Sequence, residues 1–479
     1  MSLQIEPQVV FDWFYQINQI PRESGHEKAI SDFLVQFAKE RDLEVEQDDC
    51  WNVIIRKPAS SGYEEAEPVI IQGHMDMVCV KTEDSLHDFS KDPIEMLVEG
   101  NILRAKGTTL GGDDGIAVAM QLALLDGDYQ HPALEMLITT NEETTMAGAA
   151  AIQAGQLQGT RLLNIDGEEE GVFFTSCAGG ASISSRFALE KEAVSGTGLH
   201  IAIDGLKGGH SGMEIDKGRA NANILLFRIL SAIQEKTALR IASLSGGSRD
   251  NVIPNQAIAA IWVENGASAR RAIDEMAQVL QREFQTSDPD LSVSVESIQV
   301  DLAYTQDLTK RLLHFFSLLP NGVQALSPDI EGLVQTSLNN AVLFEKEGHL
   351  VLQTSLRSSK SSQLEELADR LKQLAEAAGG SYQRQNDYPS WDFEADSPLR
   401  EHSLAVYKEV SGQEGRYDAV HAGLECGFLK KALPDCDMIS YGPNIYDVHS
   451  TKEHLEIDSV ARVWAFTKAL LARDRKSVV

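Results

Sequence analysis

Cysteine is scarce in this sequence, and no paired cysteine motif occurs. There are 5 cysteines, they are widely spaced, and no two form a CxxC pair. Secreted disulfide frameworks need a denser and even-numbered set, so we expect reduced thiols and a cytoplasmic protein. The sequence also lacks a basic run followed by an apolar one at its N-terminus, and it lacks an apolar run of membrane-spanning length. We therefore predict neither a signal peptide nor a transmembrane segment.

Basic residues are also in short supply. The chain has 42 lysines and arginines against 72 acidic residues, for a formal net charge of -30. An acidic excess of this size repels polyanions. We expect no nucleic-acid partner and no membrane partner, and most of the acidic residues should be solvated surface.

The length of the chain, 479 residues, predicts at least two domains. In the first part, short apolar runs between glycine, proline and polar clusters read as buried strands, and a helix over 116–125 lies among them. These runs are Val53–Ile55, Pro68–Ile71, Leu134–Ile138 and Leu162–Ile165. Ser24-Gly25-His26-Glu27 has the form of a capping box before an earlier helix. This alternation predicts an α/β domain with a mostly parallel central sheet.

The pattern changes after Ala178-Gly179-Gly180. From Phe187 to Pro389 the predicted strands alternate between apolar and polar residues, and two long amphipathic helices are expected over 267–284 and 363–378. A strand over 438–441 and a terminal helix then follow. We predict a discontinuous catalytic domain over 1–186 and 391–479, with an inserted α+β domain over 187–390.

Ligand-type side chains follow the predicted strands of the first domain where each strand ends. In parallel α/β sheets, this carboxyl edge is where ligands bind. Taken singly, each segment is also typical of an acidic turn, a helix start or a structural histidine. We expect Glu168-Glu169-Glu170 to be solvated surface and His454 to be structural. The five segments are His74-Met75-Asp76, Gly111-Gly112-Asp113-Asp114-Gly115, Asn141-Glu142-Glu143, Asn164-Ile165-Asp166 and Asp447-Val448-His449-Ser450.

Taken together, the segments favour a metal site. His74 and Asp76 face the same way on an extended chain, which pairs an imidazole with the carboxylate that a metal-bound histidine usually contacts. The adjacent Asp113-Asp114 carboxylates repel unless a cation neutralises them. Of Glu142 and Glu143, one can bind metal while the other serves as a general base. Imidazoles and carboxylates without cysteine suit zinc, manganese or cobalt.

The order of these motifs resembles the dinuclear-zinc exopeptidase family that includes carnosinases and peptidase T. Longer stretches are similar to its bacterial Xaa-His dipeptidases, the aminoacyl-histidine dipeptidases or peptidase D group, and the similarity covers essentially the whole chain. One departure is Asp114, where many relatives carry asparagine. The stretches are Gly107-Thr108-Thr109-Leu110-Gly111, Cys177-Ala178-Gly179-Gly180, Gly205-Leu206-Lys207-Gly208-Gly209-His210-Ser211-Gly212 and His421-Ala422-Gly423-Leu424-Glu425-Cys426-Gly427.

The resemblance implies a zinc-exopeptidase-like catalytic domain with an inserted lid, two bound Zn²⁺ ions and a homodimer formed through the lid. Asp113 would bridge the two ions, Asp76 would orient His74, and Glu142 would be the general base. The lid would grip a small peptide substrate. The implied metal ligands are His74, Asp113, Glu143, Asp166 and His449, and the implied substrate-binding residues are His210, Asn251 and Arg357.

The sequence thus predicts a metal-dependent dipeptidase that cleaves short peptides, Xaa-His dipeptides among them. An aminoacylase or deacetylase would use the same metal ligands and differ in what the lid contacts. A non-catalytic metal- or peptide-binding protein on the same scaffold is a third alternative. His421 and Glu425 lie in a shared motif but receive no role from the sequence.

Overall fold

The chain folds into two compact units. The structure is a computed structural model, and it describes residues 3–473. The first unit contains Met1–Ser176, Phe393–Ala419 and Leu424–Val479, and the second contains Cys177–Asp392 and Val420–Gly423. The second unit begins before residue 187, because β9 (Gly179–Ala188) pairs with β18 and β19 of that unit.

The first unit is built on an eight-stranded sheet with a parallel centre. β6, β3, β7 and β21 pair in parallel, and antiparallel strands flank them on both sides. Every residue of β3 and β6 is buried, as expected for strands covered on both faces. Across the sheet the strands are β1 (Glu44–Gln47), β2 (Val53–Lys57), β6 (Leu134–Thr139), β3 (Val69–His74), β7 (Arg161–Asn164), β21 (Asp437–Ser440), β8 (Val172–Cys177) and β20 (Arg416–Val420).

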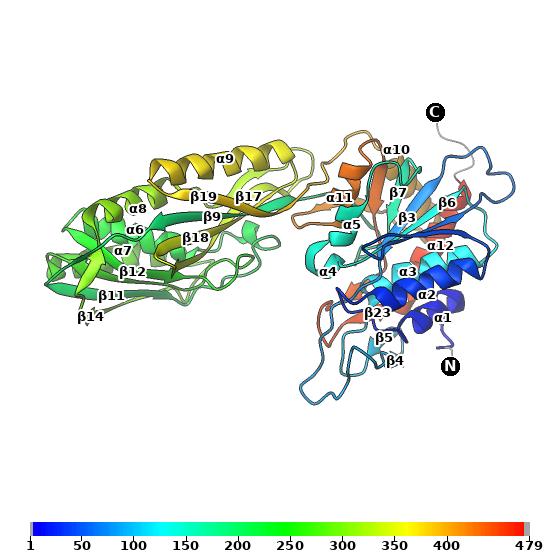
Figure 1. Ribbon diagram of the computed structural model, residues 1–479, viewed down its shortest axis with the longest axis horizontal. Coiled ribbons are helices and arrows are strands. Elements are labelled where there is room, and N and C mark those ends of the chain that lie inside the picture. Colours follow the sequence, from blue (N-terminus) through cyan, green and yellow to red (C-terminus); the bar gives the residue numbers. More distant parts are fainter. Residues whose placement is uncertain (1–2, 474–479) are drawn as a thin grey trace. The chain divides into compact units, whose positions relative to one another are not determined.

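Helices pack on both faces of this sheet (Figure 1). On one face, a Cβ at Gly73 would lie 2.8 Å from Ala117 of α3, so glycine permits the close approach. On the other face, Gln72 contacts Glu425 of α11. The helices are α1 (Gln8–Ile17), α2 (Lys28–Lys39), α3 (Gly112–Asp126), α4 (Glu142–Thr145), α5 (Ala147–Ala151), α10 (Pro398–Ser411), α11 (Glu425–Ala432) and α12 (Ile457–Arg473).

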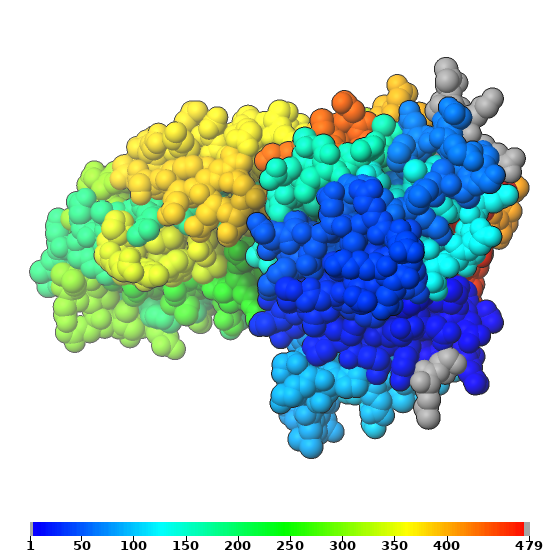
Figure 2. Space-filling model, turned by 45° about the vertical axis from the view of Figure 1, so that its right-hand side comes forward, coloured from blue at the N-terminus to red at the C-terminus, as the bar shows by residue number. Residues whose placement is uncertain are grey.

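A four-stranded sheet forms a smaller part of the first unit. Its order is β22 (Ile445–Tyr446), β23 (His454–Glu456), β5 (Ile102–Ala105) and β4 (Met96–Glu99). The segment that leads into β4 projects from the surface of this unit (Figure 2), and Leu86 on it is 97% exposed. The loop between β22 and β23 carries His449.

The second unit is an α+β structure with a largely antiparallel nine-stranded sheet. The main strand order is β14 (Ser292–Ile298), β11 (Thr197–Asp204), β13 (Ala257–Val263), β12 (Leu239–Gly246), β17 (Val334–Lys346), β18 (His349–Ser358), β9 and β19 (Ser381–Tyr388), and β16 (Gly322–Leu326) pairs with β17. β10 (Lys191–Ala193) pairs with β15 (Leu302–Tyr304). A 3-10 helix spans Ile215–Lys217, and the α-helices are α6 (Ala222–Gln234), α7 (Gly266–Glu283), α8 (Gln306–Leu318) and α9 (Ser361–Ala377).

The predicted fold class is confirmed, while three local expectations are wrong. Ser24 caps no helix, because its hydroxyl donates to Asp76 over 2.7 Å instead. Glu170 is not free surface, because its buried carboxylate pairs with Arg462 at 2.6 Å. The second unit also has helices α6 and α8 beside the two expected ones, since the apolar run inside α6 hides its helical period. Within residues 3–473, no helix has the length and apolar character needed to cross a membrane.

Candidate metal centre

The five predicted metal ligands of the first unit converge at the carboxyl edge of its parallel strands. β3 ends at His74, and Asp166 follows β7. Glu143 lies on α4, directly after β6, and Asp113 lies at the start of α3. His449 reaches the same place from the loop between β22 and β23. This is the sheet edge at which α/β proteins bind ligands.

Asp113 lies between the two histidines. Its Oδ1 is 3.1 Å from His74 Nε2, and its Oδ2 is 3.2 Å from His449 Nε2. Asp166 Oδ1 is 3.7 Å from His74 Nε2, and Glu143 Oε2 is 2.8 Å from His449 Nε2. Ligand atoms that are each about 2 Å from one zinc ion lie about 3–4 Å apart. The distances therefore suit two ion sites that share Asp113.

The ligand atoms also group as such a centre requires. In each of two trios, the atoms lie within 4.8 Å of one another: His74–Asp113–Asp166 and Asp113–Glu143–His449. A third trio, His74–Glu142–Glu143, places Glu142 beside the same centre. Glu143 Oε1 is buried and lacks a hydrogen-bond partner among the described residues. This oxygen is therefore available to bind a cation.

Asp76 holds the first histidine and the glutamate helix together. His74 Nδ1 lies 3.4 Å from Asp76 Oδ1 and 3.2 Å from the Asp76 carbonyl oxygen. The backbone N–H groups of Glu142 and Glu143 donate to the Asp76 carboxylate over 3.1 and 3.3 Å. With the Ser24 hydroxyl, these donors fix the buried carboxylate and leave His74 Nε2 directed at Asp113. This is the contact that usually orients a metal-bound histidine.

The charges of the centre call for cations. Burial, together with the neighbouring charges of Glu425 and Glu143, raises the pKa of Glu142 to about 8. Burial and the neighbouring Asp114 raise the pKa of Asp166 well above its usual range. Hydrogen bonds to Asp113 and Glu143 raise the pKa of His449 to about 11. Without metal, protons must offset this cluster of carboxylates, and divalent ions would replace them.

Glu425, which the sequence left without a role, lies beneath this centre. Its Oε2 accepts hydrogen bonds from Gln72 (2.6 Å) and Thr139 (2.7 Å), on the strands that carry His74 and precede Glu142. Asn164 on β7 donates to Gln72 over 2.6 Å. Glu425 therefore joins neighbouring ligand-bearing strands from the face covered by α11.

The three predicted substrate-binding residues all lie in the second unit. His210 forms a bridge with Val252, so it lies next to the segment that carries Asn251. Arg357 is on β18 and donates to the Tyr388 hydroxyl over 3.0 Å. Burial and the charge of Arg357 lower the pKa of His210.

A row of paired residues surrounds Arg357. Ser337, Arg357, Gly180 and Tyr388 face one another across β17, β18, β9 and β19. A Cβ at Gly180 would lie 2.3 Å from the Tyr388 hydroxyl, so only glycine lets the tyrosine reach across β9 to Arg357. The Ser337 hydroxyl lies 2.7 Å from His421 Nε2. The Cys177–Gly180 and His421–Gly427 motifs also meet directly, because the Ala178 N–H donates to the carbonyls of Val420 and Ala422.

We expect His421 to stay uncharged well below neutral pH. Burial and the charge of Arg357 lower its pKa to about 4, against about 6.5 for a free histidine. Between these values only the unfolded chain binds the proton, so the stability contributed by neutral His421 is present above about pH 6.5 and is lost as the pH falls toward about 4. Carbon-13 NMR of histidine-labelled protein, with H421Q to assign the signal, measures the pKa of His421. A His421 signal that titrates near pH 6.5 would contradict the prediction.

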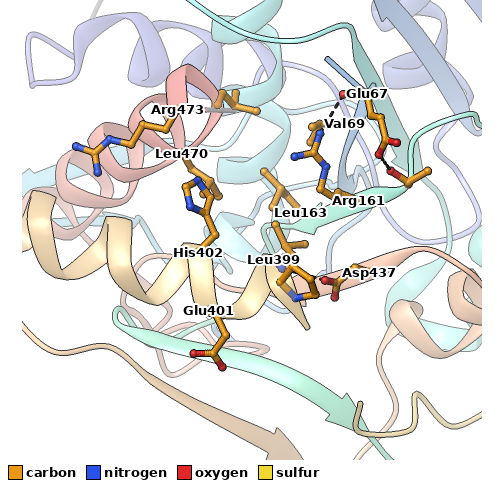
Figure 3. Close-up of a pocket in the computed structure, with 13 residues that line it drawn as sticks. Glu67, Val69, Arg161, Leu163, Leu399, Glu401, His402, Asp437, Leu470 and Arg473 are labelled. Carbon is orange, nitrogen blue, oxygen red and sulfur yellow. Dashed lines mark hydrogen bonds between the residues drawn. The ribbon is translucent and has the colours of Figure 1, made fainter. Parts of the chain in front are cut away.

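A separate cavity of about 590 Å³ lies at the opposite edge of the sheet (Figure 3). Its lining includes Val69, Arg161 and Asp437, which begin β3, β7 and β21. Leu399 and Leu470 contribute to its apolar walls. His74 and Asp166 lie at the other ends of the strands, so this cavity is not part of the metal centre.

Comparison with known proteins agrees with this geometry. The model of peptidase family M20/M25/M40 matches residues 70–473. The cytosol non-specific dipeptidase of Escherichia coli (strain K12) is 37% identical over 477 residues, which cover 98% of each chain.

Solved structures are similar as well. The aminoacylhistidine dipeptidase from Vibrio alginolyticus has 35% sequence identity and a TM-score of 0.93, and the match covers 98% of this chain and 97% of that one. The aminopeptidase PepT from Bacillus cereus shares the fold at 14% identity, with a TM-score of 0.57 over 98% of this chain and 99% of that one.

Proposed function

This chain belongs to the peptidase family M20/M25/M40, and on that basis we propose that it is a metal-dependent dipeptidase. One observation carries the proposal: the two oxygens of Asp113 face different histidines, His74 and His449. Two metal ions about 3.5–4 Å apart are common in hydrolytic sites, and one carboxylate can bridge two such ions. The family is metal-dependent, which agrees with this donor set.

We assign His74, Asp113 and Asp166 to one divalent ion. Glu143, Asp113 and His449 would hold the second. Zinc suits these imidazole and carboxylate donors, and manganese or cobalt could replace it. Bound ions of this kind supply Lewis acidity, which polarises a peptide carbonyl and lowers the pKa of water.

Glu142 is the proposed general base. It lies beside the centre, and the Asp76 carboxylate holds its backbone N–H over 3.1 Å. Its carboxylate would take a proton from the attacking water and deliver it to the amine nitrogen as the peptide C–N bond breaks. One water and one dipeptide thus become two amino acids, and Glu142 returns to its starting state.

The second unit would act as the lid that binds the substrate. His210 Nδ1 accepts hydrogen bonds from the backbone N–H groups of Gly212 (3.2 Å) and Met213 (3.1 Å). Its proton is therefore on Nε2, which is the form that can donate to a developing oxyanion. The guanidinium of Arg357 suits the substrate carboxylate, and Asn251 can donate to a carbonyl oxygen. Closure of such a lid would exclude water and align the peptide.

Metal analysis of the purified protein beside a substrate panel tests the proposal. We expect two ions per chain and hydrolysis of dipeptides, Xaa-His dipeptides among them. A chelator should abolish turnover, and zinc, manganese or cobalt should restore it. Preferred hydrolysis of N-acyl amino acids would instead indicate an aminoacylase. Bound metal without turnover of any peptide would indicate a binding protein.

We also propose that the protein works as a cytoplasmic homodimer that associates through the second unit. β14, at the edge of the nine-stranded sheet, leaves one side of its backbone available for pairing. Sedimentation velocity should give about twice the chain mass of 52.5 kDa. A monomer at micromolar concentration would contradict the dimer without affecting the proposed chemistry.

A further inference from the structure

We propose that Glu453 and Arg22 are positioning residues that clamp the Leu110–Asp113 loop from two sides and thereby set Asp113 between the two ions. The inference rests on the proposed function, because it concerns the loop that carries the bridging ligand. Neither residue belongs to a motif that the sequence singled out. Both are buried, at 3% and 2% exposure.

Glu453 binds the N–H side of the loop. Its Oε2 accepts from the backbone N–H groups of Leu110 (2.7 Å) and Gly111 (3.1 Å). Its Oε1 accepts from Gly112 (2.7 Å) and, more weakly, Asp113 (3.4 Å). Four consecutive N–H groups thus converge on one carboxylate, as in an anion-binding nest.

Arg22 binds the carbonyl side of the same loop. Its Nη2 donates to the Gly111 carbonyl over 2.6 Å, and its Nη1 donates to the carbonyls of Met75 and Asp76, each over 3.1 Å. One planar guanidinium thereby joins the bridging loop to the segment that carries His74 and Asp76. Lysine has no such fork of donors.

The clamp explains why this loop contains glycines. A Cβ at Gly111 would lie 2.2 Å from Arg22 Nη2, and the φ of Gly111 is +68°. A Cβ at Gly112 would lie 3.0 Å from Leu455 and 3.3 Å from Glu453 Oε1. Side chains at either position would push the charged groups off the backbone.

Glu453 also connects two of the three proposed ligands of the second ion, His449 and Asp113. It follows His449 on the same loop, and its own N–H donates to the Ser450 carbonyl over 3.1 Å. One end of this short segment therefore supplies a histidine ligand, while the other end holds the backbone of Asp113. A shift of Glu453 would change the distance between His449 and Asp113.

A purely structural role is the alternative, because Glu453 also satisfies N–H groups at the start of α3. The two roles differ in what E453Q changes. The variant keeps the size of the side chain, but the amide nitrogen that replaces one carboxylate oxygen cannot accept from the two N–H groups that face it. If Glu453 positions Asp113, metal affinity falls; if it only caps the helix, the folded variant binds metal normally.

The experiment measures zinc affinity by chelator competition, with the melting temperature of the metal-free protein recorded in parallel. We expect E453Q to bind the weaker ion about 10–100-fold less tightly and to lower kcat more than it raises KM. E135Q is the matched control, because Glu135 is also buried and accepts backbone N–H groups of Gln158 (2.7 Å) and Gly159 (2.8 Å). It should lower the melting temperature and leave metal affinity unchanged.

Wild-type zinc affinity in a folded E453Q would overturn the inference. If E453Q does not fold, R22K tests the inference, because lysine keeps the positive charge but lacks the two-pronged set of N–H donors. We expect R22K to weaken zinc binding in the same way. Unchanged zinc affinity in R22K would overturn the proposed clamp. Wild-type protein that binds no metal would instead refute the proposed function, so the two failures are distinguishable.

Discussion

Replacement of Glu142 by glutamine should lower kcat by about 10²–10⁴-fold and leave the metal content unchanged. The amide keeps the size of the side chain but cannot accept the proton of the attacking water. The backbone N–H of residue 142 still reaches Asp76, because that hydrogen bond does not involve the side chain. Metal analysis of E142Q and steady-state kinetics on a dipeptide measure the two quantities.

Two neighbouring variants make this result specific. E143Q should lose metal and activity together, since Glu143 Oε2 lies 2.8 Å from His449 within the proposed second ion site. E169Q alters an exposed acid that pairs with Arg416, and it should change neither quantity. An E142Q enzyme with wild-type kcat would remove Glu142 from the mechanism.

Replacement of Asp113 by alanine should remove both ions and reduce activity to the background of the assay. Asp113 faces both histidines, so its loss opens both sites at once. D166N should affect only the site beside His74 and leave about one ion per chain. Metal analysis after dialysis against a weak chelator distinguishes these stoichiometries.

D437N provides the matched control for both aspartate variants. Asp437 accepts hydrogen bonds from Ser397 and the Leu399 N–H at the opposite edge of the sheet. The variant should retain both ions even if it is less stable. D113A protein that still holds two ions would show that Asp113 does not bridge them.

The sequence located segments that carry ligands because His74, Glu143 and Asp166 follow strands of the parallel sheet. Strand ends can be located from apolar runs, and the family resemblance selected His74, Asp113, Glu143, Asp166 and His449 among the residues there, which the structure brings together. Their metal-binding roles still await the experiments described above. No local pattern gives a role to Arg22, Glu425 or Glu453, because each acts on backbone or side chains that are distant in sequence.

Local patterns were misleading where tertiary contacts compete for a side chain. Ser24 and Glu27 match a capping box, but Ser24 donates to Asp76, and Glu27 accepts from the Gly25 and Asn141 N–H groups. A hydrogen bond to a buried carboxylate at the site outweighs a helix cap that water can replace. The exception therefore lies next to the functional centre, where local and global preferences conflict.

The first unit is assembled from three stretches of chain, and the second unit is encoded between them. During synthesis, Asp113, Glu143 and Asp166 leave the ribosome long before His449 does. A nascent chain can therefore collect the ligands of one ion early, but it cannot complete the other until translation is nearly finished. The second ion could then bind only after His449 has been synthesised. Products truncated before His449 would therefore lack a complete metal centre and would have no peptidase activity.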